Sequence, residues 1–172
     1  MSTRLSYIQQ KIVSAEEAVK LVNLWKVKDE GVVFTNGCFD ILHQGHVTYL
    51  AEAASHGHRL IIGLNTNASV KRLGKGDDRP VNDEAARAMV IAALGVVDLV
   101  VFFDEDTPLE LIRALNPDVL AKGADYDPSE INPESKKYIV GSDLIHQNGG
   151  EVVAVPLVEG FSTTAILAKL RS

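Results

Sequence analysis

Two histidines, His43 and His46, stand three positions apart in the sequence HQGH, with Gly45 between them. Residues three apart on a helix lie on the same side of one turn, so both imidazoles can face one ligand. Imidazole groups titrate near neutral pH and can stabilise charge that develops on a phosphoryl group. Gly45 leaves room for a ligand to approach the backbone. The pattern indicates chemistry on phosphate.

The residues around this motif predict how it is positioned. The apolar run from Val32 to Phe34 is short enough to be a buried strand. Apolar residues recur at helical spacing after His46, so a helix is expected over residues 45–56. A strand, turn and helix in this order point backbone N–H groups and the positive helix end at one spot, which suits an anion. The alternative is a hairpin turn at Asn36-Gly37 with two surface histidines, which the full pattern disfavours.

Apolar runs and helical patterns alternate along the rest of the chain. The expected strands cover residues 32–36, 59–65, 97–103, 118–121 and 151–156. The expected helices cover residues 14–31, 45–56, 67–73, 83–95, 107–117, 134–147 and 163–170. This alternation predicts an α/β fold, a Rossmann-like, doubly wound parallel sheet of five strands with helices on both faces. Residues 1–31 are expected to form an N-terminal segment with one helix, and residues 32–172 the main domain.

Ligands of such sheets bind outside the carboxyl ends of the strands. Five residues whose types suit a ligand lie at or just after predicted strand ends: Thr35, Asn36, Asn65, Lys122 and Gly123. Lys122 directly follows an apolar strand, so its ammonium group must leave the core toward this edge. We therefore expect a binding site there.

Composition narrows the class of protein. The chain has 172 residues, of which 46% are hydrophobic and 23% charged, as expected for one soluble globular domain. The formal net charge of −6 argues against a nucleic-acid partner, although Lys71, Arg72, Lys75 and Arg79 gather in one positive region that suits a small anion. No apolar run approaches the ~20 residues that a membrane helix needs. The single cysteine, Cys38, forms no internal disulfide, which predicts the cytoplasm.

A family resemblance adds to these predictions. The segment around His43 and His46 resembles the HxGH signature of the cytidylyltransferase-like nucleotidyltransferases, with Phe39-Asp40 upstream in the usual place. Five further stretches are similar to the D-glycero-β-D-manno-heptose 1-phosphate adenylyltransferases, free-standing or as the second half of a bifunctional kinase–adenylyltransferase: residues 63–71, 79–82, 103–108, 122–126 and 162–164. The resemblance covers most of the chain from Val32 to Leu170.

The resemblance implies a nucleotidyltransferase-type fold and the transfer of AMP from ATP to the sugar 1-phosphate, which gives ADP-heptose and pyrophosphate. The implied catalytic residues are His43, His46, Lys71 and Lys122. The implied nucleotide contacts are Thr35, Asn36, Gly37, Phe39, Gly45, Arg79, Ser162, Thr163 and Thr164. The implied contacts to the second substrate are Asp40, Asn65, Lys75, Gly123, Asp125 and Tyr126. No Cys, His, Asp and Glu cluster has metal-ligand spacing. Mg²⁺ is expected to arrive mainly on the phosphates of ATP, because this ion keeps several waters and takes few protein ligands.

Several alternatives stay open. A cytidylyltransferase acting on glycerol 3-phosphate or a related alcohol phosphate is the second enzyme candidate, and a nucleotide-binding regulatory domain is the non-enzyme candidate. A homo-oligomer is compatible with the helix over residues 14–31, whose apolar stripe packs on the body or on a second subunit. Two positions depart from the family pattern, Ala124 in place of Gly and Asn67 in place of Asp. If position 124 needs a positive φ, alanine costs about 1 kcal/mol there.

Overall fold

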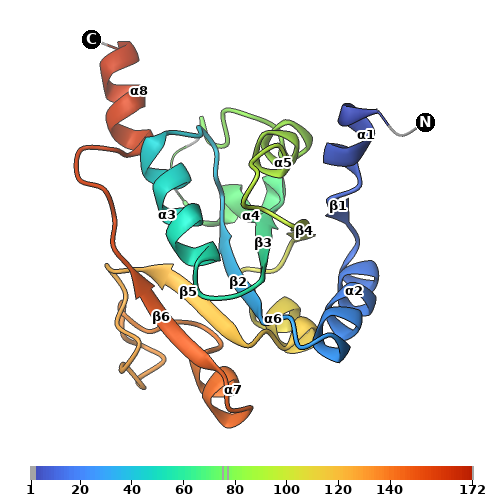
Figure 1. Ribbon diagram of the computed structural model, residues 1–172. Helices are drawn as coiled ribbons and strands as arrows, with labels where there is room; N and C mark the ends of the chain where they lie inside the picture. The colour runs from blue at the N-terminus through green and yellow to red at the C-terminus, as the bar shows by residue number, and fades with distance from the viewer. Residues whose placement is uncertain (1–2, 75, 77, 172) are drawn as a thin grey trace.

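The computed structural model describes residues 3–74, 76 and 78–171, and its centre is a sheet of six strands (Figure 1). The strands are β1 (Ile12–Val13), β2 (Val32–Gly37), β3 (Arg59–Asn65), β4 (Leu99–Phe103), β5 (Val119–Gly123) and β6 (Glu151–Val155). The helices are α1 (Arg4–Gln9), α2 (Ala15–Val27), α3 (Gln44–Ala54), α4 (Asn67–Arg72), α5 (Glu84–Ala92), α6 (Leu109–Leu115), α7 (Ser142–Gln147) and α8 (Thr163–Arg171). All strand pairings are parallel, so the predicted α/β fold with a parallel sheet is confirmed.

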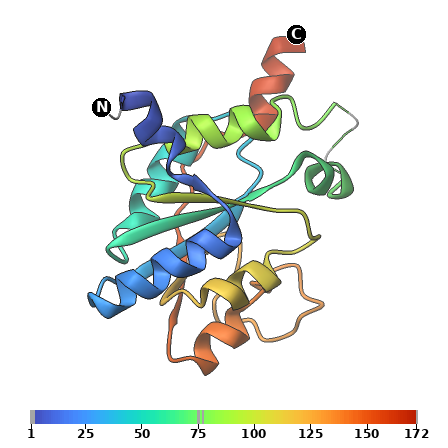
Figure 2. The same ribbon diagram turned by 90° about the vertical axis from the view of Figure 1, so that its right-hand side faces the viewer.

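Side chains of successive strand residues enter two different cores. On β2, Val33 packs in a core with α3 and α5, while Phe34 packs on the opposite face with α2, α6 and α7. Figure 2 shows α3 and α5 on one side of the sheet, and α2, α6 and α7 on the other. Because both faces are covered, the strands are apolar at consecutive positions rather than at alternate ones.

In the strand order β1-β4-β3-β2-β5-β6, successive strands are added first on one side of β2 and then on its other side. The chain moves outward from β2 through β3 to β4, and then returns to place β5 on the other side of β2. The connections after β2 and β5 therefore leave the sheet in opposite directions, which opens a crevice at their carboxyl ends. This switch point positions the site described below.

The N-terminal segment differs from the sequence-based expectation. Residues 3–31 hold α1, β1 and α2 rather than one helix, and β1 pairs with β4 as a sixth strand where five were expected. A strand of two residues, Ile12 and Val13, is too short to show any periodic pattern, so only its partner reveals it. The helix expected to start at Ser14 does form, with the predicted capping box between Ser14 and Glu17.

The segment before α7 is also different. A helix was expected over residues 134–147, but α7 begins only at Ser142, after Gly141 in the left-handed conformation (φ 90°). The residues before it form hydrogen-bonded turns, such as the one that joins the Asp127 N–H to the Lys137 carbonyl. These turns bring Asp125, Tyr126, Tyr138 and Val140 to the carboxyl edge of β5, where they form part of the wall of a cavity.

Candidate active site

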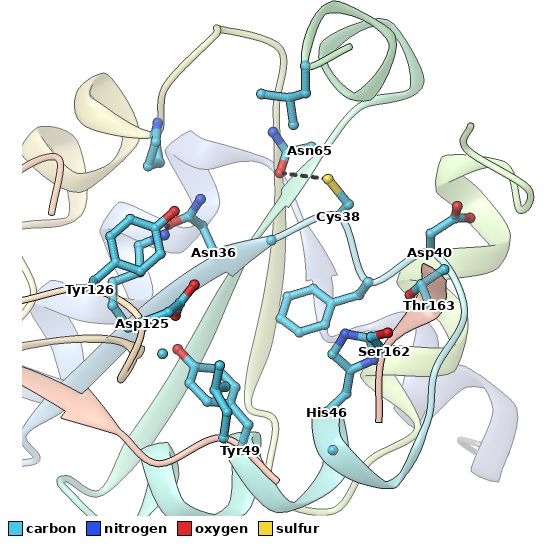
Figure 3. A pocket seen from close by; sticks show the side chains of 18 of the residues that line it. Asn36, Cys38, Asp40, His46, Tyr49, Asn65, Asp125, Tyr126, Ser162 and Thr163 are labelled. Carbon is cyan, nitrogen blue, oxygen red and sulfur yellow. Dashed lines mark hydrogen bonds between the residues drawn. The ribbon is translucent and has the colours of Figure 1, made fainter. Parts of the chain in front are cut away.

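A cavity of about 670 Å³ lies at the carboxyl edge of the sheet, where β2 and β5 diverge. Its walls come from the segments that follow β2, β3, β4, β5 and β6, and from the first residues of α3 and α8 (Figure 3). Most of the residues predicted from the sequence line it: Asn36, Gly37, Phe39, Asp40, His43, Gly45, His46, Asn65, Arg79, Lys122, Gly123, Asp125, Tyr126, Ser162 and Thr163. The topology thus gathers residues that are far apart in the chain.

His43 and His46 form a stacked pair at the start of α3. Their ring centroids are 3.8 Å apart with an interplanar angle of 18°. His43 is the N-cap of α3, and its Nδ1 accepts the backbone N–H of His46 at 3.4 Å. Because Nδ1 accepts, the proton of the neutral His43 ring is on Nε2, which is then a donor.

His46 is held in the neutral form. Burial, with a smaller contribution from the neighbouring His43, lowers the pKa of His46 to about 4. The ring of Phe39 meets it edge to face, with centroids 5.2 Å apart. The Nδ1 atom of His46 is buried and has no hydrogen-bond partner among the residues that the structure describes. A buried polar atom without a partner is costly, which makes it a candidate contact for a ligand.

The start of α8 reaches the same cavity. The Ser162 hydroxyl accepts the N–H of Ala165 at 3.0 Å, so the predicted helix cap is present. A Cβ atom at Gly45 would lie 3.0 Å from the Cβ of Phe161, so glycine at this position lets the segment before α8 pack closely against the start of α3. Two helix N-termini, of α3 and α8, therefore face one cavity, and each is favourable for negative charge.

Lys122 occupies the wall at the end of β5. Its Nζ donates to the Oδ1 of Asn36 on β2 at 2.6 Å and lies 5.4 Å from the ring centroid of Tyr126. The side chain of Asp125 lies close to the end of this strand, since a Cβ atom at Gly123 would lie 2.6 Å from the Asp125 Oδ1. The ammonium group bridges the two strands of the switch point.

Asp40 and Arg79 form a buried ion pair at another wall. Arg79 Nε donates to Asp40 Oδ2 at 2.5 Å, and the backbone N–H groups of Val81 and Asn82 each donate to the same carboxylate at 2.9 Å. Burial alone would raise the pKa of Asp40, but these donors together hold it below its usual range. The charge of Arg79 is therefore already matched within the protein. Its side chain lines the cavity, yet its first role is to fasten residues 79–82 to the loop after β2.

Four residues predicted for the site are not placed in the wall. Thr35 is fully buried and shares a hydrogen bond of 2.7 Å with the hydroxyl of Tyr49, because alternate residues of β2 face opposite sides. Lys71 is exposed at the end of α4, next to the buried Ser69 and Val70 that define the inner face of that helix. Thr164 is exposed beyond the wall, and Lys75 lies outside the described residues.

Other lining residues were missed from the sequence: Cys38, Tyr49, Leu73, Phe103, Asp106, Thr107, Pro108, Tyr138, Val140, Leu157, Val158 and Phe161. The group from Phe103 to Pro108 begins at the last residue of a predicted strand, so the rule that ligands bind at strand ends could have found it. Tyr138 and Val140 carried no such signal, because the turns that bring them to the cavity have no periodic pattern. Among the described residues, no group of three or more His, Cys, Asp or Glu side chains could hold a metal ion. None of the described helices is long and apolar enough to cross a membrane.

The doubly wound sheet and the stacked histidines at the start of α3 define a nucleotidyltransferase-type α/β domain. The family model described as cytidylyltransferase-like matches residues 34–169, and the chain belongs to this family. The crystal structure of the pantoate-beta-alanine ligase from Francisella tularensis has the same fold, with a TM-score of 0.58 at 12% identity, covering 93% of this chain and 76% of that one.

Two further comparisons are closer in sequence. The chain is 54% identical over 161 residues to the bifunctional protein HldE of Azorhizobium caulinodans, an alignment that covers 94% of this chain and 32% of that protein. The crystal structure of the lipopolysaccharide core biosynthesis protein from Thermoplasma volcanium is 27% identical with a TM-score of 0.58, covering 75% of this chain and 97% of that one. The chain spans about a third of the length of the curated relatives it matches.

Proposed function

We propose that this domain transfers AMP from ATP to D-glycero-β-D-manno-heptose 1-phosphate, giving ADP-heptose and pyrophosphate for lipopolysaccharide or another surface glycan. The observation that carries the proposal is the convergence of the HQGH motif at the start of α3 and Ser162-Thr163 at the start of α8 on one cavity. The resemblance of the motif series supports the sugar substrate. The similarity to HldE and to a lipopolysaccharide core biosynthesis protein agrees with it.

The reaction needs no nucleophile from the protein. An oxygen of the sugar phosphate attacks the α-phosphorus of ATP in line, the bond from that phosphorus to the bridging oxygen breaks, and pyrophosphate leaves with the electron pair. The protein contributes position and charge stabilisation. In our proposal His43 and His46 donate to the phosphate oxygens as charge develops, and Lys122 neutralises negative charge from the opposite wall. The two helix ends hold the remaining phosphates.

Mg²⁺ fits this arrangement as a companion of the nucleotide. Asp40 is already saturated by Arg79 and two backbone N–H groups, so it is a poor metal ligand. Of the other two carboxylates of the wall, Asp106 pairs with Arg72 at 2.7 Å, so Asp125 is the one that could add an oxygen to an ion bound mainly by phosphates, which is the usual mode for Mg²⁺. The ion would withdraw charge from the triphosphate. We assign the reaction to the cytoplasm, with ATP and the sugar phosphate as partners.

The test is pyrophosphate release by the purified chain with each of four nucleoside triphosphates and a panel of phosphorylated acceptors. The panel contains D-glycero-β-D-manno-heptose 1-phosphate, its α-anomer and glycerol 3-phosphate. We expect release with ATP and the β-anomer, at a rate well above every other pair. Release with CTP and glycerol 3-phosphate would overturn the proposal.

The second candidate function is that of a cytidylyltransferase acting on glycerol 3-phosphate or a related alcohol phosphate. The observation that favours it is the description of the matching family as cytidylyltransferase-like. Nucleotide binding by calorimetry without pyrophosphate release from any pair would instead indicate a regulatory domain.

A further inference from the structure

Arg87 is a buried arginine that the proposed reaction does not use. It lies on α5 with 1% of its surface exposed and is among the largest fully buried side chains of the described chain. Burying a guanidinium group is costly unless its donors are satisfied. The position therefore needs a specific explanation.

The guanidinium group of Arg87 donates hydrogen bonds to four acceptors. Nη1 donates to the carbonyl of Cys38 at 2.6 Å, and Nη2 donates to the carbonyl of Asn65 at 2.8 Å. Nη2 also donates to the side chain of Asn67 at 3.0 Å, and Nε to the carbonyl of Asn82 at 3.1 Å. None of the ion pairs in the described part of the chain includes Arg87. Its hydrogen bonds thus go to carbonyl and amide oxygens, while the carboxylates of Asp40, Asp83 and Glu84 favour its charge from a longer distance.

These acceptors belong to the segments that build the cavity. Cys38 directly follows β2, and Asn65 is the last residue of β3. Both residues line the cavity, and the Cys38 Sγ lies 3.8 Å from the Asn65 Oδ1 (Figure 3). Asn82 belongs to the segment whose N–H holds Asp40. One planar group thus joins the ends of two neighbouring strands to the first residue of α4 and to the segment before α5.

We propose that Arg87 is a positioning residue for the cavity, which fixes the backbone at Cys38 and Asn65 so that the residues around them face the bound phosphates in one arrangement. It touches no substrate. Its effect runs through the loop from Cys38 to Asp40, which leads directly into the histidine motif. Arginine suits this task because its donors have a fixed, planar geometry that a lysine ammonium group does not reproduce.

The first test needs no enzymatic activity. Cys38 is the single cysteine of the chain and is 9% exposed, so the rate at which a thiol reagent such as DTNB modifies it reports the opening of this loop. We expect Arg87→Met to raise the rate about tenfold or more, and Arg87→Lys to raise it by a smaller factor.

The matched control is Arg59→Met. Arg59 begins β3 at the opposite edge of the sheet, where it pairs with Glu30 at 2.7 Å and Asp98 at 3.1 Å. Urea is added until the compared variants have equal free energies of unfolding. Equal modification rates in the Arg87 and Arg59 variants would then mean that Arg87 contributes only global stability, and the inference would be overturned. If Arg87→Met does not fold, Arg87→Lys is compared with Arg59→Lys in the same way.

The second test rests on the proposed function. Arg87→Lys should lower kcat/KM for pyrophosphate release by about 10- to 100-fold, because small misplacements of the groups that position a substrate are amplified in the rate. Asn67→Asp keeps an acceptor for Arg87 and should retain turnover. Unchanged kinetics in Arg87→Lys would overturn the inference. If the unmodified chain releases no pyrophosphate with any substrate, the proposed function fails, and the thiol experiment alone decides the role of Arg87.

Discussion

The Nδ1 atom of His43 accepts the backbone N–H of His46, and the two imidazole rings stack 3.8 Å apart. This single contact caps α3 and brings both rings to one wall of the cavity. It also means that a proton on His43 Nδ1 would break the cap. The pair is therefore built to act in its neutral form, with positive charge supplied by Lys122 and the helix ends.

His46→Ala should lower turnover by about 100-fold or more, the scale on which a donor to a transition-state oxyanion acts. The fold should survive, since the cap of α3 uses the His43 ring and only the backbone of His46. Steady-state pyrophosphate release and circular dichroism measure the two effects. Near-normal turnover at saturating substrate would show that this histidine has no role in the chemistry.

The stability of the protein should fall as the pH is lowered from about 6.5 toward about 4. The pKa of His46 is depressed to about 4 from its usual value of 6.5, so the unfolded chain takes up a proton in this window and the folded chain does not. Burial lowers the pKa of His43 as well, which adds to the effect. Urea unfolding at a series of pH values measures it. His46→Gln should flatten the curve, and an equal slope in that variant would contradict the assignment.

Asp40→Asn should destabilise the fold by about 3–5 kcal/mol, because it leaves the Arg79 guanidinium buried without its counter-charge. The pKa of Asp40 is depressed, so its contribution is present above the unfolded pKa and is lost as the pH falls through the folded value. Thermal unfolding at neutral pH measures the loss. Glu110→Gln, in the exposed pair with Arg113, is the control and should change little. If the two substitutions lowered the free energy of unfolding equally, the buried Asp40–Arg79 pair would stabilise the fold no more than the exposed pair does.

Lys122→Ala should lower kcat/KM by about tenfold or more, because a charge-assisted hydrogen bond to phosphate is lost. Little stability should be lost, as the side chain is half-buried at a strand end. Lys11→Ala is the control, since Lys11 donates to the carbonyls of Leu94 and Val97, away from the cavity wall. A large fall in Tm with unchanged kinetics in Lys122→Ala would identify a structural lysine.

Ala124→Gly should destabilise the protein by about 0.5–1 kcal/mol rather than relieve strain. The expected cost of alanine at this position does not arise, because Ala124 is not among the residues with positive φ. Its N–H donates to the Val155 carbonyl at 2.9 Å in the turn that follows β5. Differential scanning calorimetry of the glycine variant measures the change. A rise in stability would contradict this account of the backbone.

Much of the fold could be predicted because the inner strands are buried on both sides. β3 occupies residues 59–65 as expected, since its continuous apolar run has a clear beginning and end. β1 could not be predicted, because two residues acquire their conformation from the pairing with β4. The helix expected from residue 134 was wrong for the related reason that Gly141 and the turns before it decide where α7 begins.

The residues of the candidate site that lie at strand ends could be predicted from the sequence, whereas those that lie in turns could not. Asn36 and Lys122 follow from the rule that ligands bind at carboxyl ends of strands. The alternation of β2 could have separated Asn36 from Thr35, which faces Tyr49 instead. Tyr138 reaches the cavity through irregular turns whose path no local pattern encodes.

The switch point between β2 and β5 has a consequence for how the protein folds. Asn36 and Lys122 are hydrogen-bonded but 86 positions apart in the sequence. The chain between them forms β3 and β4, which lie on the other side of β2. Closing so long a loop is slow, because its entropy cost is offset by native contacts only when β5 pairs with β2. During synthesis, a ribosome-bound chain that ends before β5 can hold strands β1 to β4 and both histidines but still lacks the wall that carries Lys122. Nucleotide binding by nascent chains would thus report the completion of the sheet.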